Sequence, residues 1–165
     1  VLTDDVQWSG TALAKAEESP HRLLYLTAPL DEPLHISGRP QLRIRMSSDK
    51  PAANLSVWLV SLPWNDQQGA SINDNLITRG WADPQNHRSL WESEPLEPGK
   101  FYEWSFDLQP DDQIIPPGQQ IGLMIFSSDQ DFTLWPEAGS KITVDLEKTN
   151  LTLPVVGGNE PWKKR

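Results

Sequence analysis

The sequence contains no cysteine, which excludes disulfide bonds and thiolate metal sites and leaves the redox compartment open. It also lacks any run approaching the roughly 18 apolar residues that a membrane-spanning helix needs. Its first stretch, VLTDDVQWSG, has neither the basic nor the apolar region of a signal peptide. These absences predict a soluble protein with no membrane partner, and we favour a cytoplasmic location.

Positive charge is scarce as well. The chain has 14 Lys and Arg residues against 23 Asp and Glu residues, a formal net charge of -9, and no basic cluster. Because such a surface repels phosphate backbones, we expect no nucleic-acid partner. A length of 165 residues fits a single domain, which we place at 1–158, followed by a tail at 159–165. The chain starts at Val1 rather than at Met, so we expect it to be a piece of a longer protein.

Long helical segments are not expected, because fifteen Pro and ten Gly are spread along the chain. In QLRIRM, the apolar Leu42, Ile44 and Met46 alternate with polar residues, which is typical of a half-buried strand. The segments FYEWSFDL and KITVDLE repeat this alternation. Many strands punctuated by turns predict an all-β jelly-roll sandwich. The only helix expected is a short one near the N-terminus, at 11–19.

Two further segments, NLSVWLVSL and QIGLMIFSS, are apolar on both faces. A strand of this kind belongs in the centre of a sheet that is covered on each side. One cover is the second sheet of the sandwich. We interpret the other as the contact surface of another domain.

The stretch NLITRGWADPQNHRSL gathers residue types that carry chemistry: Arg79, Trp81, Asp83, His87 and Arg88. We expect its strand to end near Thr78 and a turn to follow at Asp83-Pro84, because Asp and Pro favour that conformation. Arg79 or Arg88 is expected to pair with Asp83. The five residues form a candidate cleft or interdomain loop.

Catalysis within this chain is not expected. An α/β-hydrolase nucleophile lies in a G-x-S-x-G elbow, and the nearest run, GASIN at 69–73, lacks the closing Gly and follows no βα pattern. The three His residues, His21, His35 and His87, are distant from one another in sequence, which argues against a zinc site. We predict His87 to be a polar loop residue, and we assign neither a catalytic residue nor a cofactor.

One weak candidate remains for a metal. In SSDQDF, Asp129 and Asp131 are spaced like the start of a calcium loop, but the glycine of an EF-hand is missing. A solvated turn is the favoured interpretation of these two carboxylates.

Eight Trp residues in an acidic sandwich suggest a second hypothesis, a carbohydrate-binding module that stacks sugar rings on exposed indoles. Its platforms would be Trp64, Trp81 and Trp91, which fall at turns or strand ends. Trp58 and Trp104 lie in apolar strands and are predicted to be core. Loop aromatics beside Arg fit a protein–protein contact equally well, including one between copies of the chain in a homo-oligomer.

Several stretches together resemble the C-terminal, non-catalytic domain of the X-prolyl dipeptidyl peptidase family of serine hydrolases, with cocaine esterase and α-amino acid ester hydrolases as more distant relatives. The resemblance covers most of the chain, from about Leu23 to Gly158. It is carried by RLLYLTAPLDEPLHISGRPQLRIRMSSDKPAANLSVWLV, LITRGWADPQNHRSL, PLEPGKFYEWSFDLQPDDQIIPPGQQIGLMIFSSDQDFTLWPEAGSKITVDL and LTLPVVGG.

The resemblance implies a jelly roll of the galactose-binding-like type that follows an α/β-hydrolase domain in the parent chain. The catalytic Ser, Asp and His of the family lie in that upstream domain, and no residue here matches them. The parent would hydrolyse X-Pro dipeptides from peptide N-termini, or related acyl esters. This domain would pack on the hydrolase domain and shape its active-site cleft.

Overall fold

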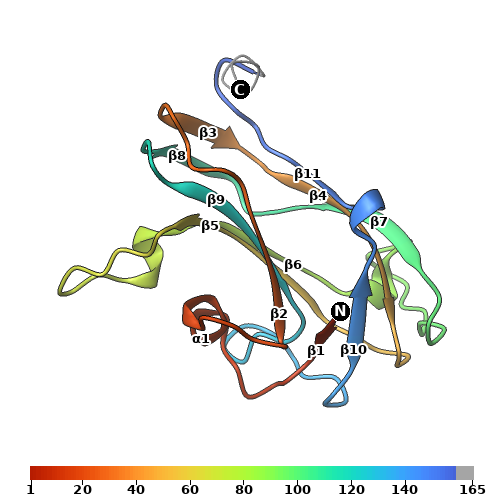
Figure 1. The fold of residues 1–165 in the computed structure, drawn as a ribbon. Coiled ribbons are helices and arrows are strands. Elements are labelled where there is room, and N and C mark those ends of the chain that lie inside the picture. The colour runs from red at the N-terminus through yellow and green to blue at the C-terminus, as the bar shows by residue number, and fades with distance from the viewer. Residues whose placement is uncertain (159–165) are drawn as a thin grey trace.

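The structure is a computed structural model that describes residues 1–158, so the predicted tail at 159–165 lies outside the described residues. It is an antiparallel β-sandwich with one short α-helix, and Figure 1 shows its strands in two layers with the helix outside them. Its elements are β1 Leu2–Thr3, α1 Gly10–Lys15, β2 Arg22–Leu26, β3 Leu34–Gly38, β4 Gln41–Ser48, β5 Leu55–Leu62, η1 Ile72–Asp74, β6 Leu76–Ala82, η2 Pro84–Asn86, β7 Tyr102–Asp107, β8 Asp111–Ile115, β9 Gln120–Phe126, β10 Lys141–Val144, η3 Leu146–Lys148 and β11 Asn150–Thr152.

The first sheet is organised around β4. Strand β7 pairs along one edge of β4, from Gln41 to Met46. Along the other edge, β11 pairs with Gln41–Arg43 and β10 with Met46–Ser48, so these two short strands together act as one interrupted neighbour. Strand β1 extends the sheet beyond β10.

The second sheet has the order β2-β9-β5-β6, and a separate two-stranded sheet pairs β3 with β8. Strand β5 lies in the centre, paired with β9 on one side and β6 on the other. Every residue of β5 is buried, as the apolar pattern on both of its faces predicted.

The main core lies between the two sheets. From β4 it takes Leu42, Ile44 and Met46, each no more than 1% exposed, which confirms the predicted alternation. Burying an aliphatic side chain of this size contributes roughly 1.5–3 kcal/mol to folding. Strand β7 contributes less than expected. Trp104 is only half-buried, because β7 is an edge strand whose inner face lies at the margin of this core, whereas Trp58 is fully buried as predicted.

The outer face of β5 corrects one expectation. Trp58 and Val60 pack there in a second core cluster with Leu13 and Ala14 of α1 and with Phe126 of β9. The cover that we assigned to another domain is supplied by the chain's own N-terminal helix.

The helix begins where Ser9 caps it, because the Ser9 hydroxyl accepts a hydrogen bond from the Ala12 amide at 3.2 Å. It ends at Lys15, four residues before the predicted end. There the Arg22 side chain donates to the backbone oxygens of Leu13 and Ala16 and occupies carbonyls at the end of the helix. Within the described residues no helix is long and apolar enough to cross a membrane.

Candidate functional site

The candidate loop starts from a longer strand than expected. Strand β6 continues through Ala82 rather than ending near Thr78, because Gly80, Trp81 and Ala82 keep pairing with β5. Gly80 is needed for close packing, since a Cβ at this position would lie 2.6 Å from a methyl group of Leu108. The extra residues place Arg79 and Trp81 on the rigid sheet.

The turn after β6 is the 3₁₀ helix η2. Asp83 caps it by accepting a hydrogen bond from the Gln85 amide at 3.0 Å, and Pro84 begins it. The predicted ion pair with Asp83 is wrong. Arg88 instead pairs with Glu94, six residues further along the chain, at 3.3 Å. Arg79 points to the outer face of the sheet, toward the ring of Phe132.

Arg79 lies among aromatic rings. Its guanidinium carbon is 4.2 Å from the ring centre of Phe132, 5.3 Å from that of Trp81 and 5.9 Å from that of Trp58. Cation–π contacts of this kind each stabilise by about 0.5–1 kcal/mol at exposed sites. Trp81 and Phe132 also contact each other, with ring centres 5.4 Å apart.

Four of the five predicted loop residues line one hollow. It has a volume of about 520 Å³ and lies between the end of β6, the η2 loop and β7. Trp81, Asp83, His87 and Arg88 border it, with Trp104 on the opposite wall. The fifth, Arg79, lies on the outer face of the sheet and is not among the lining residues.

His87 is held in one orientation. Its Nδ1 lies 3.1 Å from the Pro84 carbonyl oxygen, to which it donates a hydrogen bond, and its ring packs edge-on against Tyr102 at 4.6 Å. Of the described side chains, none hydrogen-bonds to its Nε2, so neither a serine nor a carboxylate completes a triad around it. This supports the prediction of a polar loop histidine.

The other two histidines lie elsewhere. His21 Nδ1 contacts the Thr3 carbonyl oxygen at 2.8 Å and its ring stacks on Trp8. His35 Nε2 lies 2.6 Å from Asp112 Oδ1, on the exposed side of the two-stranded sheet of β3 and β8. The hydrogen bond from His35, with a second from a serine hydroxyl, lowers the pKa of Asp112. In a hydrolase triad the serine hydroxyl bonds to the histidine and the histidine bonds to the carboxylate. Here the serine and His35 both bond to Asp112, so the three residues do not form a triad.

The candidate calcium carboxylates are placed differently from expectation. Asp129 is fully buried, so the solvated turn that we favoured is wrong for it. Its Oδ1 accepts a hydrogen bond from the Gly10 amide at 3.0 Å, and burial raises its pKa. The described residues contain no group of three or more His, Cys, Asp or Glu side chains around a common point. Calcium binding at Asp129 and Asp131 stays the weak candidate that the sequence offered.

The three proposed sugar platforms do not form one surface. Trp64 packs against the second core cluster. Trp81 contacts Arg79 and Phe132, and Trp91 is 93% exposed. Among the aromatic contacts of the described residues, none joins two of these indoles.

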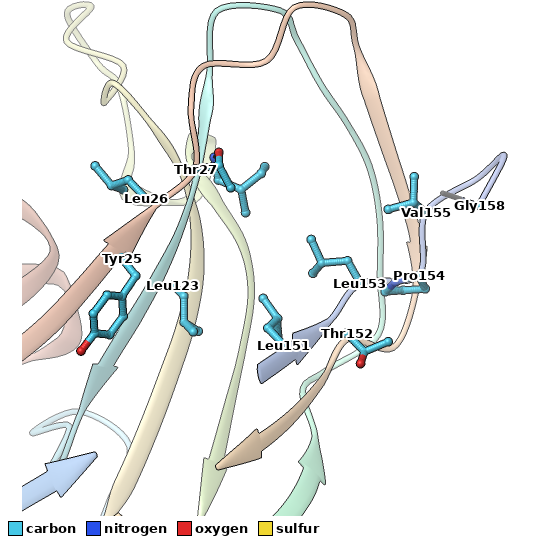
Figure 2. A pocket seen from close by; sticks show the side chains of 11 residues that line it. Tyr25, Leu26, Thr27, Leu123, Leu151, Thr152, Leu153, Pro154, Val155 and Gly158 are labelled. Carbon is cyan, nitrogen blue, oxygen red and sulfur yellow. The ribbon is translucent and has the colours of Figure 1, made fainter. Parts of the chain in front are cut away.

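A larger hollow opens at the other side of the sandwich, with a volume of about 730 Å³. Figure 2 shows side chains of the β2 and β9 strands facing those of the β11 segment across it. Tyr25, Leu123, Leu151 and Leu153 are among its lining residues, and no charged side chain lines it. Without an acid, a base or an activated nucleophile, this groove offers contact area and no chemistry.

Comparison with known proteins identifies the family to which this domain belongs. A family model described as the X-Pro dipeptidyl-peptidase C-terminal non-catalytic domain matches residues 2–163. The chain belongs to this family. The match also extends the resemblance, which we expected to begin near Leu23, to the N-terminal segment with β1 and α1.

Two curated relatives carry the name "Putative Xaa-Pro dipeptidyl-peptidase". The one from Rhodopirellula baltica is 60% identical over 99% of this chain and 26% of its own length, and the one from Bacillus cereus is 40% identical over 93% and 25%. The solved structure of an α-amino acid ester hydrolase labelled with selenomethionine matches 90% of this chain and 27% of its own, with a TM-score of 0.72 and 18% identity. That likeness supports the fold alone.

This family member spans about a quarter of the length of the curated relatives it matches. The family description confirms that the domain is non-catalytic, in agreement with the missing nucleophile elbow. Neither these two relatives nor the solved structure is named as a carbohydrate-binding module.

The sequence patterns did not single out one residue of the aromatic cluster around Arg79. Phe132, in the loop between β9 and β10, joins Arg79 and Trp81, although it is distant from both in sequence. A signal for it was FTLWP, an apolar and aromatic run in what otherwise looks like a polar loop.

Proposed function

We propose that this domain packs on the α/β-hydrolase domain of its parent chain and forms part of the wall of that domain's active-site cleft. The parent hydrolyses X-Pro dipeptides from peptide N-termini, or related acyl esters. The proposal rests mainly on one observation, the hollow that Trp81, Asp83, His87 and Arg88 line together. It presents a cation, an imidazole and an indole on a fixed support. Its two serines, Ser89 and Ser105, are not hydrogen-bonded to His87, whose ring bonds to the Pro84 carbonyl oxygen.

The contribution of such a wall is to bind and orient substrate. Asp83 and Pro84 fix the η2 turn, and the contact with Tyr102 holds the His87 ring. Groups placed in this way narrow a cleft and select substrate ends, while the acyl transfer itself proceeds on the hydrolase domain. Coverage of only a quarter of the relatives' length supports an upstream catalytic region.

The proposal predicts a particular kinetic signature in the full-length parent. His87→Ala, Arg88→Ala and Trp81→Ala should each raise KM for an X-Pro chromogenic substrate, by about 3- to 30-fold (a loss of about 0.7–2 kcal/mol of binding), with a much smaller change in kcat. Steady-state kinetics measure both parameters. Arg39→Ala, a substitution outside the hollow, serves as the matched control and should leave KM unchanged.

An unchanged KM in all three variants would show that the loop has a purely structural role and would contradict the proposal. A fall in kcat of a thousandfold or more with His87→Ala would instead identify His87 as a catalytic group, contrary to the proposal.

A further inference from the structure

One surface of the domain combines a cation with exposed apolar side chains. It consists of Arg79 and Trp81 on β6 together with Phe132, Leu134 and Trp135 in the loop between β9 and β10, and we call it the Arg79 face. Phe132 is 51% exposed, Trp135 58% and Leu134 92%. Aromatic residues and arginine are the types enriched in the cores of protein interfaces, whereas large apolar side chains crowded on a free surface are unusual.

The loop that carries these apolar residues is firmly held. The Asp4 carboxylate accepts hydrogen bonds from the amide and the hydroxyl of Ser128, both at 2.9 Å. The Asn54 side chain donates to the Leu134 carbonyl oxygen, which places that residue beside the paired ends of β5 and β6. The exposed side chains are therefore presented in a fixed position, as a preorganised contact surface requires.

Arg79 forms no salt bridge among the described residues, although its charge acts on the buried Asp129 carboxylate. Arg22 and Arg39 form none either, whereas the other three described arginines do. Arg43 pairs with Glu103, Arg45 with Asp145 and Arg88 with Glu94. The rings of Phe132 and Trp81 hold the Arg79 guanidinium instead. Its N–H groups form a planar fork that matches a carboxylate, and a carboxylate on a partner would complete the pairing that the domain itself does not supply.

The position of the Arg79 face indicates which partner it meets. The loop contacts the start of the chain directly, because Asp4, the residue after β1, accepts the two hydrogen bonds from Ser128, and the Gly10 amide donates to Asp129 at 3.0 Å. In this family the domain is C-terminal, and three quarters of the relatives' length lies outside the match. The preceding chain therefore reaches the domain next to this face.

We infer that the Arg79 face is the docking surface for the upstream hydrolase domain, and that Arg79 pairs there with a carboxylate of that domain. The inference rests on the proposed function and adds to it the place and the chemistry of the contact. It also assigns different roles to two neighbouring surfaces that share Trp81. The Arg79 face holds the domains together, while the His87 hollow faces the cleft.

Photo-cross-linking in the full-length parent tests this contact. Benzoylphenylalanine replaces Phe132 and, in a control protein, Ile114, an apolar residue of β8 that is 65% exposed and outside the Arg79 face. After irradiation and digestion, mass spectrometry should find peptides that join position 132 to the region upstream of Val1 of the same molecule. Their yield should exceed that from position 114 at least tenfold. Links between two copies, or equal yields at the two positions, would contradict the inference.

The carboxylate is tested in the same protein. Adding Arg79→Glu should reduce the cross-link from position 132 at least fivefold, because two carboxylates then face each other, whereas Arg39→Glu should leave it unchanged. A yield unaffected by Arg79→Glu would overturn the ion pair. Circular dichroism confirms that each variant is folded. The outcome is distinguishable from failure of the proposed function, because the KM effects of the His87 and Arg88 variants do not depend on where the cross-link forms.

Discussion

At the scale of single residues, the most informative groups are those whose partners come from distant parts of the chain. In the sequence, Asp129 was interpreted as a residue of a solvated turn and as a weak calcium candidate, yet it is fully buried and accepts a hydrogen bond from the Gly10 amide. Its Oδ2 and the Trp58 Nε1 are both buried without a hydrogen-bond partner among the described residues. No local pattern reports a contact across 119 positions of sequence.

Asp129 leads to a prediction about pH. Burial raises the pKa of this carboxyl in the folded state, so the folded protein binds its proton more tightly than the unfolded chain does. The contribution of Asp129 to stability is therefore fully present below the usual Asp pKa and is lost as pH rises through the raised value. Asp129→Asn abolishes this dependence, and its stability relative to the wild type should improve as pH rises through that window.

Urea unfolding across a pH series measures the difference between the two proteins. Asp31→Asn, at an exposed carboxylate, is the matched control and should follow the wild type. A stability difference between the Asp129→Asn variant and the wild type that does not change with pH would contradict the account.

The Arg79 cluster shows the same limit at residue scale. The sequence marked Arg79, Trp81, His87 and Arg88 as residues of interest, because charged and aromatic side chains in a short stretch are unusual, and their functional role stays a prediction. It predicted the wrong partners. Asp83 is nearest in sequence, but its oxygen is occupied by the Gln85 amide, and the pairing of β5 with β6 turns Arg79 toward Phe132.

At the scale of elements, strands with a clear pattern were predictable and their covers were not. The alternation of Leu42, Ile44 and Met46 located β4, and the apolar run on both faces located the central strand β5. That run did not reveal what lies against its outer face. The helix that covers it is six residues long, and its burial depends on packing against Trp58 rather than on helix propensity.

This packing gives a prediction for the helix. Gly10 begins α1, and a Cβ there would lie 2.3 Å from Cζ2 of Trp58 and 2.8 Å from Oδ2 of Asp129. Gly10→Ala should therefore lower the free energy of unfolding by about 1–3 kcal/mol, because a buried contact must shift. Thr11→Ala, at the next helical position, should change it by less than about 0.5 kcal/mol. Chemical denaturation of both variants checks the difference, and equal effects would show that α1 is not tightly packed.

At the scale of the whole molecule, the described residues form a β-sandwich whose surface includes the hollow lined by His87 and the Arg79 face. The chain belongs to a family of non-catalytic domains. The jelly-roll and galactose-binding-like type of the sandwich stays a prediction. The sequence was sufficient to predict the fold class and the family, because strand periodicity and family motifs lie in short, contiguous stretches of sequence. It was insufficient for the Arg79 face, which takes residues from β6 and from a loop about fifty positions later.

The central claim is that this domain supports a hydrolase without performing the reaction. The most direct test assays the purified 165-residue chain with an X-Pro chromogenic substrate. The account predicts a rate equal to that of the buffer blank, because no described serine, histidine and carboxylate form a triad. Turnover that survives purification and is abolished by His87→Ala would contradict it.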